Sequence, residues 1–122
     1  MFSFLQKPKA IITLQDNAIG NHEFVLKENS IEIGRNKSPF SKKLIEKIGS
    51  KITIAGNDMT KRISTEHGTF LWDKTKYKYT YQEHSEKGTL VDGEPLEHGE
   101  QKLLESGSEI VIHPFKFKIN YP

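Results

Sequence analysis

The chain has 122 residues, of which 28% are charged and 34% hydrophobic, and its formal net charge is +2. This length suits one domain with its own core, and the absence of cysteine excludes disulfide scaffolds, thiolate zinc sites and cysteine nucleophiles. The balanced charge does not suggest a nucleic-acid binder, no apolar run reaches the roughly 18 residues of a membrane span, and the first residues lack the basic start of a secretion signal. We therefore expect a monomeric intracellular protein, nuclear or cytoplasmic, with no nucleic-acid or membrane partner.

Short segments rich in β-branched and aromatic residues recur along the chain, with turn residues between them. They predict strands at 11–14, 23–27, 31–33, 51–54, 68–72, 77–81, 89–91, 101–104, 109–112 and 115–119. Tyr77, Tyr79 and Tyr81 are two positions apart and are expected to share one face of a strand. Asp92-Gly93 favours a tight hairpin turn. This spacing of strands is typical of a β-sandwich or barrel.

Residues 38–48 interrupt the pattern and predict one short helix. Ser38 suits the N-cap, Pro39 suits the first helical position, and Gly49 suits the residue just past the end. The apolar residues that would share one side of this helix are Leu44, Ile45 and Ile48. A helix of about ten residues is only marginally stable alone. We therefore expect it to dock on the sandwich, the alternative being that it forms a contact surface for a partner.

Three motifs follow one another between the predicted strands. The first is Gly34-Arg35 at a strand end, the second is Ser64-x-x-His67 before a strand, and the third is the run from Ser85 to Gly93, SEKGTLVDG. In this order they resemble the forkhead-associated (FHA) domain, whose pattern is Gly-Arg, then Ser-x-x-His, then Ser-x-Asn-Gly-Thr-x-Val-Asn-Gly. The segment 104–112, a leucine and a polar turn before an apolar strand, is similar to the end of that family. The resemblance covers about residues 10–120.

The resemblance implies an all-β fold, an FHA-like sandwich of two twisted sheets with about 11 strands and the inserted helix near residues 38–48. Residues 1–122 would form a single FHA-like domain with its core at about 10–120. The implied function is a phosphothreonine-dependent protein–protein interaction, in which loops at one end of the sandwich bind a phosphorylated peptide segment of a partner. Such a phosphate carries roughly −1.5 to −2 charges and three strong acceptor oxygens, which suit a guanidinium, hydroxyl groups and backbone N–H groups.

The resemblance also implies residue roles. Arg35 would supply positive charge to the phosphate, Ser64 would donate its hydroxyl, and Thr65 would make a further contact. His67 would brace the loops without touching the peptide. The residues expected to shape the loops are Gly34, His67, Gly88 and Thr89.

Three features depart from the family pattern. Lys87 stands where the family prefers asparagine; its ammonium adds charge but has no acceptor for a peptide N–H. Glu86, on the same loop, would repel a phosphate if it pointed inward. Arg35 and Ser64 are 29 positions apart (64 − 35), which is more than the usual gap, and the predicted helix accounts for the excess.

Arg62 precedes Ser64 by two positions, so in an extended segment both side chains would point the same way. With Lys37, Lys61 and Lys87 it would form a basic rim. We therefore add Arg62 and Lys87 to the phosphopeptide-binding candidates, with Arg62 meeting either the phosphate or an acidic residue a few positions after the phosphothreonine.

Two other functions remain open. The first is an FHA-like interaction or assembly module with a degenerate phosphate pocket, which would bind its partner independently of phosphorylation. The second is a domain with a basic rim that binds nucleic acid or anionic lipid, with an affinity that depends strongly on salt. Catalysis is not expected, because Ser64 and His67 have no third orienting group and no oxyanion-hole motif. The other histidines lack the spacing of metal ligands, so we expect no metal and no cofactor.

Overall fold

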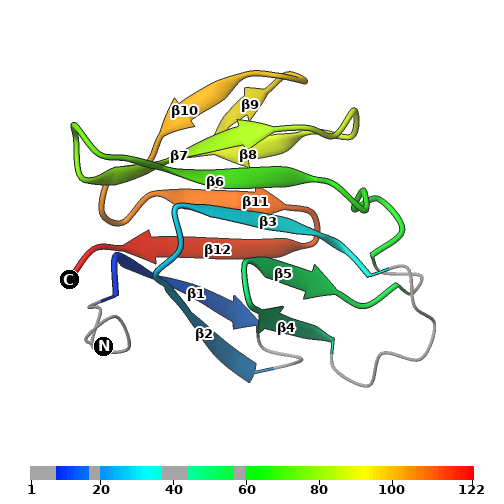
Figure 1. Cartoon of the computed structure of the whole chain (residues 1–122). Coiled ribbons are helices and arrows are strands. Elements are labelled where there is room, and N and C mark those ends of the chain that lie inside the picture. The colour runs from blue at the N-terminus through cyan, green and yellow to red at the C-terminus, as the bar shows by residue number, and fades with distance from the viewer. Residues whose placement is uncertain (1–7, 17–19, 37–43, 57–59) are drawn as a thin grey trace.

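The computed structural model describes residues 8–16, 20–36, 44–56 and 60–122, and these residues form twelve strands in two six-stranded sheets (Figure 1). The strands are β1 (Ala10–Asp16), β2 (Gly20–Leu26), β3 (Ser30–Arg35), β4 (Ile45–Ile48), β5 (Lys51–Ile54), β6 (Gly68–Asp73), β7 (Lys78–Glu83), β8 (Thr89–Val91), β9 (Glu94–Leu96), β10 (Gln101–Leu103), β11 (Glu109–Ile112) and β12 (Phe115–Asn120). One sheet has the order β2-β1-β12-β11-β8-β9 and the other the order β10-β7-β6-β3-β5-β4. β3 and β5 pair in parallel, and the other pairs in the described part are antiparallel.

The core lies between the two sheets, and alternation along the strands builds it. In β12, Phe115, Phe117 and Ile119 are buried while the residues between them are exposed. In β7, from the other sheet, Tyr79 and Tyr81 are fully buried. Residues from both sheets belong to one hydrophobic cluster, so the predicted all-β sandwich is confirmed.

The hairpin predicted at Asp92-Gly93 is also confirmed. Val91 pairs with Glu94, which leaves two residues in the turn between β8 and β9. Asp92 has a φ of 52° and Gly93 a φ of 82°. Positive φ at both central residues belongs to the type I′ turn, whose twist matches that of the flanking strands and which favours Asp-Gly.

The helix predicted at 38–48 is wrong where the structure describes it. Ile45–Ile48 is strand β4, which pairs with β5 through a two-residue turn at Gly49 and Ser50. Ile45 is buried and Ile48 is 63% exposed, so the apolar residues do not share one face as a helix would require. Gly49, with a φ of 59°, serves a hairpin turn and not a helix end. The predicted start of the helix, 38–43, lies outside the described residues.

The prediction for the three tyrosines is correct for two of them. Tyr79 and Tyr81 share the inward face of β7. Tyr77 precedes the strand in the β6–β7 turn, with a φ of 54° and 73% of its surface exposed. Its ring packs edge-on against Trp72, with 6.5 Å between ring centroids. The turn needs a residue in the left-handed region there, so the strand begins only at Lys78.

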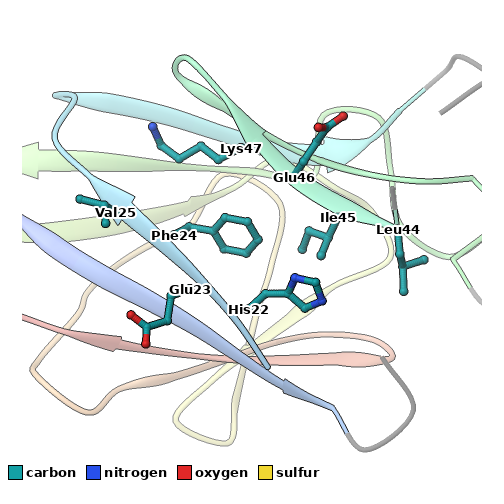
Figure 2. Close-up of a pocket in the computed structure, with 8 residues that line it drawn as sticks. All are labelled: His22, Glu23, Phe24, Val25, Leu44, Ile45, Glu46 and Lys47. Atoms are coloured by element: carbon teal, nitrogen blue, oxygen red, sulfur yellow. The ribbon is translucent and has the colours of Figure 1, made fainter. Parts of the chain in front are cut away.

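A groove of about 680 Å³ separates the edge strands β2 and β4 of the two sheets. Figure 2 shows Phe24 of β2 and Ile45 of β4 extending into the space between these strands, with His22 beside Phe24. The lining residues are His22, Glu23, Phe24, Val25, Leu44, Ile45, Glu46 and Lys47. None of them belongs to the three motifs, so this groove is not the predicted peptide site.

No helix within residues 8–16, 20–36, 44–56 and 60–122 is long and apolar enough to cross a membrane.

Candidate functional site

The first motif, Gly34-Arg35, ends β3 and touches the segment that carries the second motif. The Arg35 N–H donates to the Ser64 carbonyl oxygen over 2.9 Å. A Cβ atom at position 34 would lie 2.0 Å from the Thr65 carbonyl oxygen, which is far inside van der Waals contact. Glycine at 34 therefore lets the Ser64–Thr65 backbone lie directly against β3.

The segment before Ser64 is fixed by one buried side chain and a short turn. Ile63 is fully buried, and its N–H donates to the Thr60 carbonyl oxygen over 2.9 Å. The Thr60 hydroxyl donates to the Ala55 carbonyl oxygen over 2.6 Å. These contacts attach the exposed residues Lys61 and Arg62 to the end of β5.

His67 joins the second motif to the third. Its ring is buried, and Nδ1 accepts the Ser64 N–H over 3.1 Å. Since Nδ1 accepts, Nε2 carries the ring proton. Nε2 lies 3.0 Å from the Thr89 hydroxyl oxygen and 3.1 Å from the Gly88 carbonyl oxygen, both of which can accept that proton. One imidazole thus links the two loops.

Burial lowers the pKa of His67 from its ordinary value of 6.5, because the charged ring would lose its hydration. The hydrogen bond to Gly88 opposes this effect, and the positive charge of Lys87 adds to it. The neutral ring is therefore the form that fits this environment.

The loop of the third motif is shaped by Ser85. Its hydroxyl oxygen accepts the N–H groups of Lys87 over 3.2 Å and of Gly88 over 3.1 Å. The N–H of Ser85 itself donates to the His67 carbonyl oxygen over 3.1 Å. Gly88 has a φ of 89°, a conformation that favours glycine, and the chain then enters β8 at Thr89.

The charged candidates differ in exposure and pairing. Arg35 is half-buried, and no described residue accepts a hydrogen bond from its guanidinium or forms an ion pair with it. Arg62, Glu86 and Lys87 are exposed. The Lys87 ammonium donates to the Lys61 carbonyl oxygen over 3.1 Å, so the third loop reaches the second. Lys37, the other residue of the predicted rim, lies outside the described residues.

The structure therefore brings the backbones of all three motifs together. Arg35 is joined to Ser64, Ser64 to His67, and His67 to Gly88 and Thr89. Ser64 and Thr65 are half-buried beside the end of β3. Figure 1 shows β3 ending and β6 beginning on the side of the sandwich away from the C-terminus.

The sequence interpretation missed one residue beside this network. Glu83, the last residue of β7, is fully buried, and its Oε1 lies 4.0 Å from His67 Nε2. Burial raises the pKa of its carboxyl above the ordinary value of 4.5. The alternation of the strand could have identified Glu83 as a buried residue, because position 83 shares a strand face with Tyr79 and Tyr81.

The model of the FHA domain matches residues 31–113, which is more than half of the chain and includes all three motifs. This chain belongs to the FHA domain family. In a comparison with curated proteins, no sequence matches it.

Solved structures of other FHA domains share the fold. The FHA domain of the CT664 protein from Chlamydia trachomatis has a TM-score of 0.66 at 17% sequence identity, over 93% of this chain and 97% of that chain. EmbR from Mycobacterium tuberculosis, solved with a low affinity phosphopeptide, has a TM-score of 0.61 at 20% identity, over 91% of this chain and 24% of EmbR. A structure from an analysis of phosphothreonine-dependent FHA domain interactions has a TM-score of 0.63 at 18% identity, over 93% of this chain and 96% of that chain.

Proposed function

We propose that this FHA domain binds a phosphothreonine-containing segment of a partner protein through the loops that carry its three motifs. The observation that carries the proposal is the hydrogen-bonded network of these loops beside a half-buried arginine whose guanidinium has no partner among the described residues. A guanidinium held at the end of a rigid strand suits a phosphate, because it offers several N–H donors in a fixed plane. Hydrogen-bonded loops on a packed scaffold reduce the ordering that binding would otherwise require.

Several residues have defined roles in this proposal. The Arg35 guanidinium and the Ser64 hydroxyl donate to the phosphate oxygens, and Thr65 contributes a further contact. Gly34 and His67 set the distance between the loops and do not touch the peptide.

Lys87 supplies charge at the rim. Its ammonium already donates to the Lys61 carbonyl oxygen and has further donors for a phosphate. Glu86, on the same loop, is exposed, so solvent screens its repulsion.

Two of the solved structures that share this fold support the proposed phosphothreonine binding. EmbR was solved with a phosphopeptide, and a second FHA structure comes from work on phosphothreonine-dependent interactions. This chain shares their fold, and the family model covers the range that contains all three of its motifs.

Calorimetry with matched peptides tests the proposal. Peptides recovered from a degenerate phosphothreonine library are compared with their unphosphorylated and phosphoserine counterparts. We expect binding to require the phosphate and to favour phosphothreonine. Equal affinity for phosphorylated and unphosphorylated forms would favour a phosphorylation-independent assembly module instead. Indifference to phosphopeptides, together with binding to nucleic acid or anionic lipid that falls steeply with salt, would favour the basic-rim alternative.

Arg62 has a more specific proposed role, the recognition of an acidic residue at the third position after the phosphothreonine. Two phosphopeptides that differ only in an aspartate or an alanine at that position separate this role from phosphate binding. The aspartate peptide is expected to bind more tightly to the wild-type domain, and Arg62→Ala should remove that difference. Equal binding of the two peptides to wild type would exclude Arg62 from specificity.

A further inference from the structure

A buried carboxyl group lies beside the histidine that links the loops. The Glu83 side chain is fully buried, and its Oε2 has no hydrogen-bond partner within the described part of the chain. Oε1 accepts the Tyr81 hydroxyl over 3.4 Å and lies 4.0 Å from His67 Nε2. Since a buried carboxylate with an unpartnered oxygen is unfavourable, the neutral acid is the form that this environment accommodates.

The hydrogen bonds of His67 require its ring to be neutral as well. An imidazolium would carry a hydrogen on Nδ1 that points at the Ser64 N–H, so the hydrogen bond between these groups would be lost. The neutral ring is therefore required to hold Ser64 in its observed place. A carboxylate 4.0 Å from Nε2 would favour the imidazolium, whereas a neutral carboxyl would not.

We propose that Glu83 is a positioning residue of the phosphopeptide site: it keeps its proton in the folded domain and so holds His67 in the neutral form that links Ser64 to Gly88 and Thr89. The inference rests on the proposed function where it refers to phosphopeptide, because Glu83 itself touches no ligand. Burial raises the pKa of Glu83 and lowers that of His67, which agrees with a neutral pair.

The surroundings of Glu83 contain few competing charges. The titratable groups near it are His67 and Tyr81, and the Lys87 ammonium acts on His67 from the adjoining loop. From β8, the Thr89 hydroxyl oxygen lies 3.0 Å from His67 Nε2 and 3.3 Å from the Tyr81 hydroxyl, and it acts to lower the pKa of the Glu83 carboxyl, against the larger effect of burial. On the β9–β10 side, the Glu83 backbone N–H donates a hydrogen bond to the Glu100 carbonyl oxygen. The Glu100 carboxylate accepts a hydrogen bond from the Glu97 N–H.

NMR of the free wild-type domain tests the proposal directly. The ¹⁵N shifts of the His67 ring and the ¹³C shift of the Glu83 carboxyl are measured at pH 7. We expect Nδ1 to be unprotonated, Nε2 to be protonated and the Glu83 carboxyl to be neutral. A His67 imidazolium beside a Glu83 carboxylate, or an ionised Glu83 alone, would overturn the proposal.

Two variants connect this chemistry to binding. Glu83→Gln keeps a neutral polar group and Glu83→Leu keeps a neutral apolar one, so both should retain the neutral ring signature and bind phosphopeptide within about threefold of wild type. Glu86→Gln, on the exposed part of the adjoining loop, is the matched control and should leave the His67 ring shifts unchanged. A loss of tenfold or more in folded Glu83→Gln and Glu83→Leu would mean that the ionised carboxylate is the working form and would contradict the proposal.

The pH profile of binding shows which form of Glu83 acts on His67. The ratio of wild-type to Glu83→Gln dissociation constants cancels the titration of the peptide phosphate. A neutral carboxyl and the amide of the variant act alike on His67, so the ratio should stay constant as pH falls from 7 to 5. An ionised Glu83 would raise the pKa of His67 in wild type only, so a ratio that changes over this range would contradict the proposal.

Failure of this inference is separable from failure of the proposed function. The spectra of the free domain need no peptide and decide the protonation of Glu83 and His67 by themselves, even if a variant does not fold. If neither wild type nor variants bind phosphothreonine peptides, the proposed function is wrong, whereas a charged pair in a domain that binds them rejects only the role of Glu83.

Discussion

At the scale of single residues, Arg35 supplies the main positive charge for the phosphate in the proposed site. Removing charge-assisted hydrogen bonds worth about 1.5–3 kcal/mol in total should weaken phosphopeptide binding by roughly tenfold to a hundredfold in Arg35→Ala. The domain should still fold, because no described residue pairs with this guanidinium. Calorimetry and a thermal melt measure the two effects. Lys118→Ala, at an exposed site on β12, is the control for a lost charge. Unfolding of Arg35→Ala would show that the arginine is structural.

Gly34 is a residue whose side chain would have no room. In Gly34→Ala the added carbon meets the backbone of Thr65, so the 64–65 segment must move away from β3. We expect a loss of about 1–3 kcal/mol in the free energy of unfolding and weaker phosphopeptide binding. Gly56→Ala is the matched control, because its nearest neighbours would be at 3.6 Å, an ordinary contact. Similar denaturant midpoints for both variants would contradict the close approach.

His67 makes stability depend on pH. Its pKa is lowered in the folded domain, so the unfolded chain binds a proton first as pH falls below the ordinary value of 6.5. The contribution of His67 to the free energy of unfolding should therefore decrease as pH falls below 6.5, until the folded ring also protonates. In His67→Gln this contribution is absent, so the difference between wild type and variant should shrink on acidification. A difference that does not change between pH 7.5 and 5 would count against a neutral buried ring.

At the scale of elements, substitutions in β4 distinguish the observed strand from the predicted helix. In the strand, Ile45 is buried and Ile48 is 63% exposed, whereas one face of a helix would carry both. Ile45→Ala should therefore reduce the free energy of unfolding by about 2–4 kcal/mol, and Ile48→Ala by less than about 0.5 kcal/mol. Chemical denaturation measures both values. Equal losses at the two positions would favour the helix.

The strand β4 also shows that the local sequence alone does not determine its conformation. Ser38-Pro39 and Gly49 fit helix ends, yet Gly49 serves a tight turn and pairing with β5 determines the conformation of 45–48. The strands with regular alternation, such as β5 and β12, were predicted at nearly their observed bounds because one buried face repeats every second residue. The candidate residues in the three motifs follow from the order of those motifs and stay a prediction, whereas Glu83 was missed because a carboxyl group is seldom expected on a buried face.

At the scale of the whole molecule, two sheets form one core, and hydrogen bonds join the three motif loops. The groove between β2 and β4 and the turn at Tyr77 belong to other parts of the surface. A ligand recognised by the motif loops should therefore perturb those loops and leave Trp72 and Tyr77 unchanged.

A two-dimensional NMR titration of the ¹⁵N-labelled domain tests this claim most directly. It uses a degenerate phosphothreonine peptide pool and its unphosphorylated counterpart. We expect shifts at residues 34–35, 62–65 and 86–88 with the phosphorylated pool only. Shifts confined to the β2–β4 groove, or the same shifts with both pools, would contradict phosphothreonine recognition by these loops.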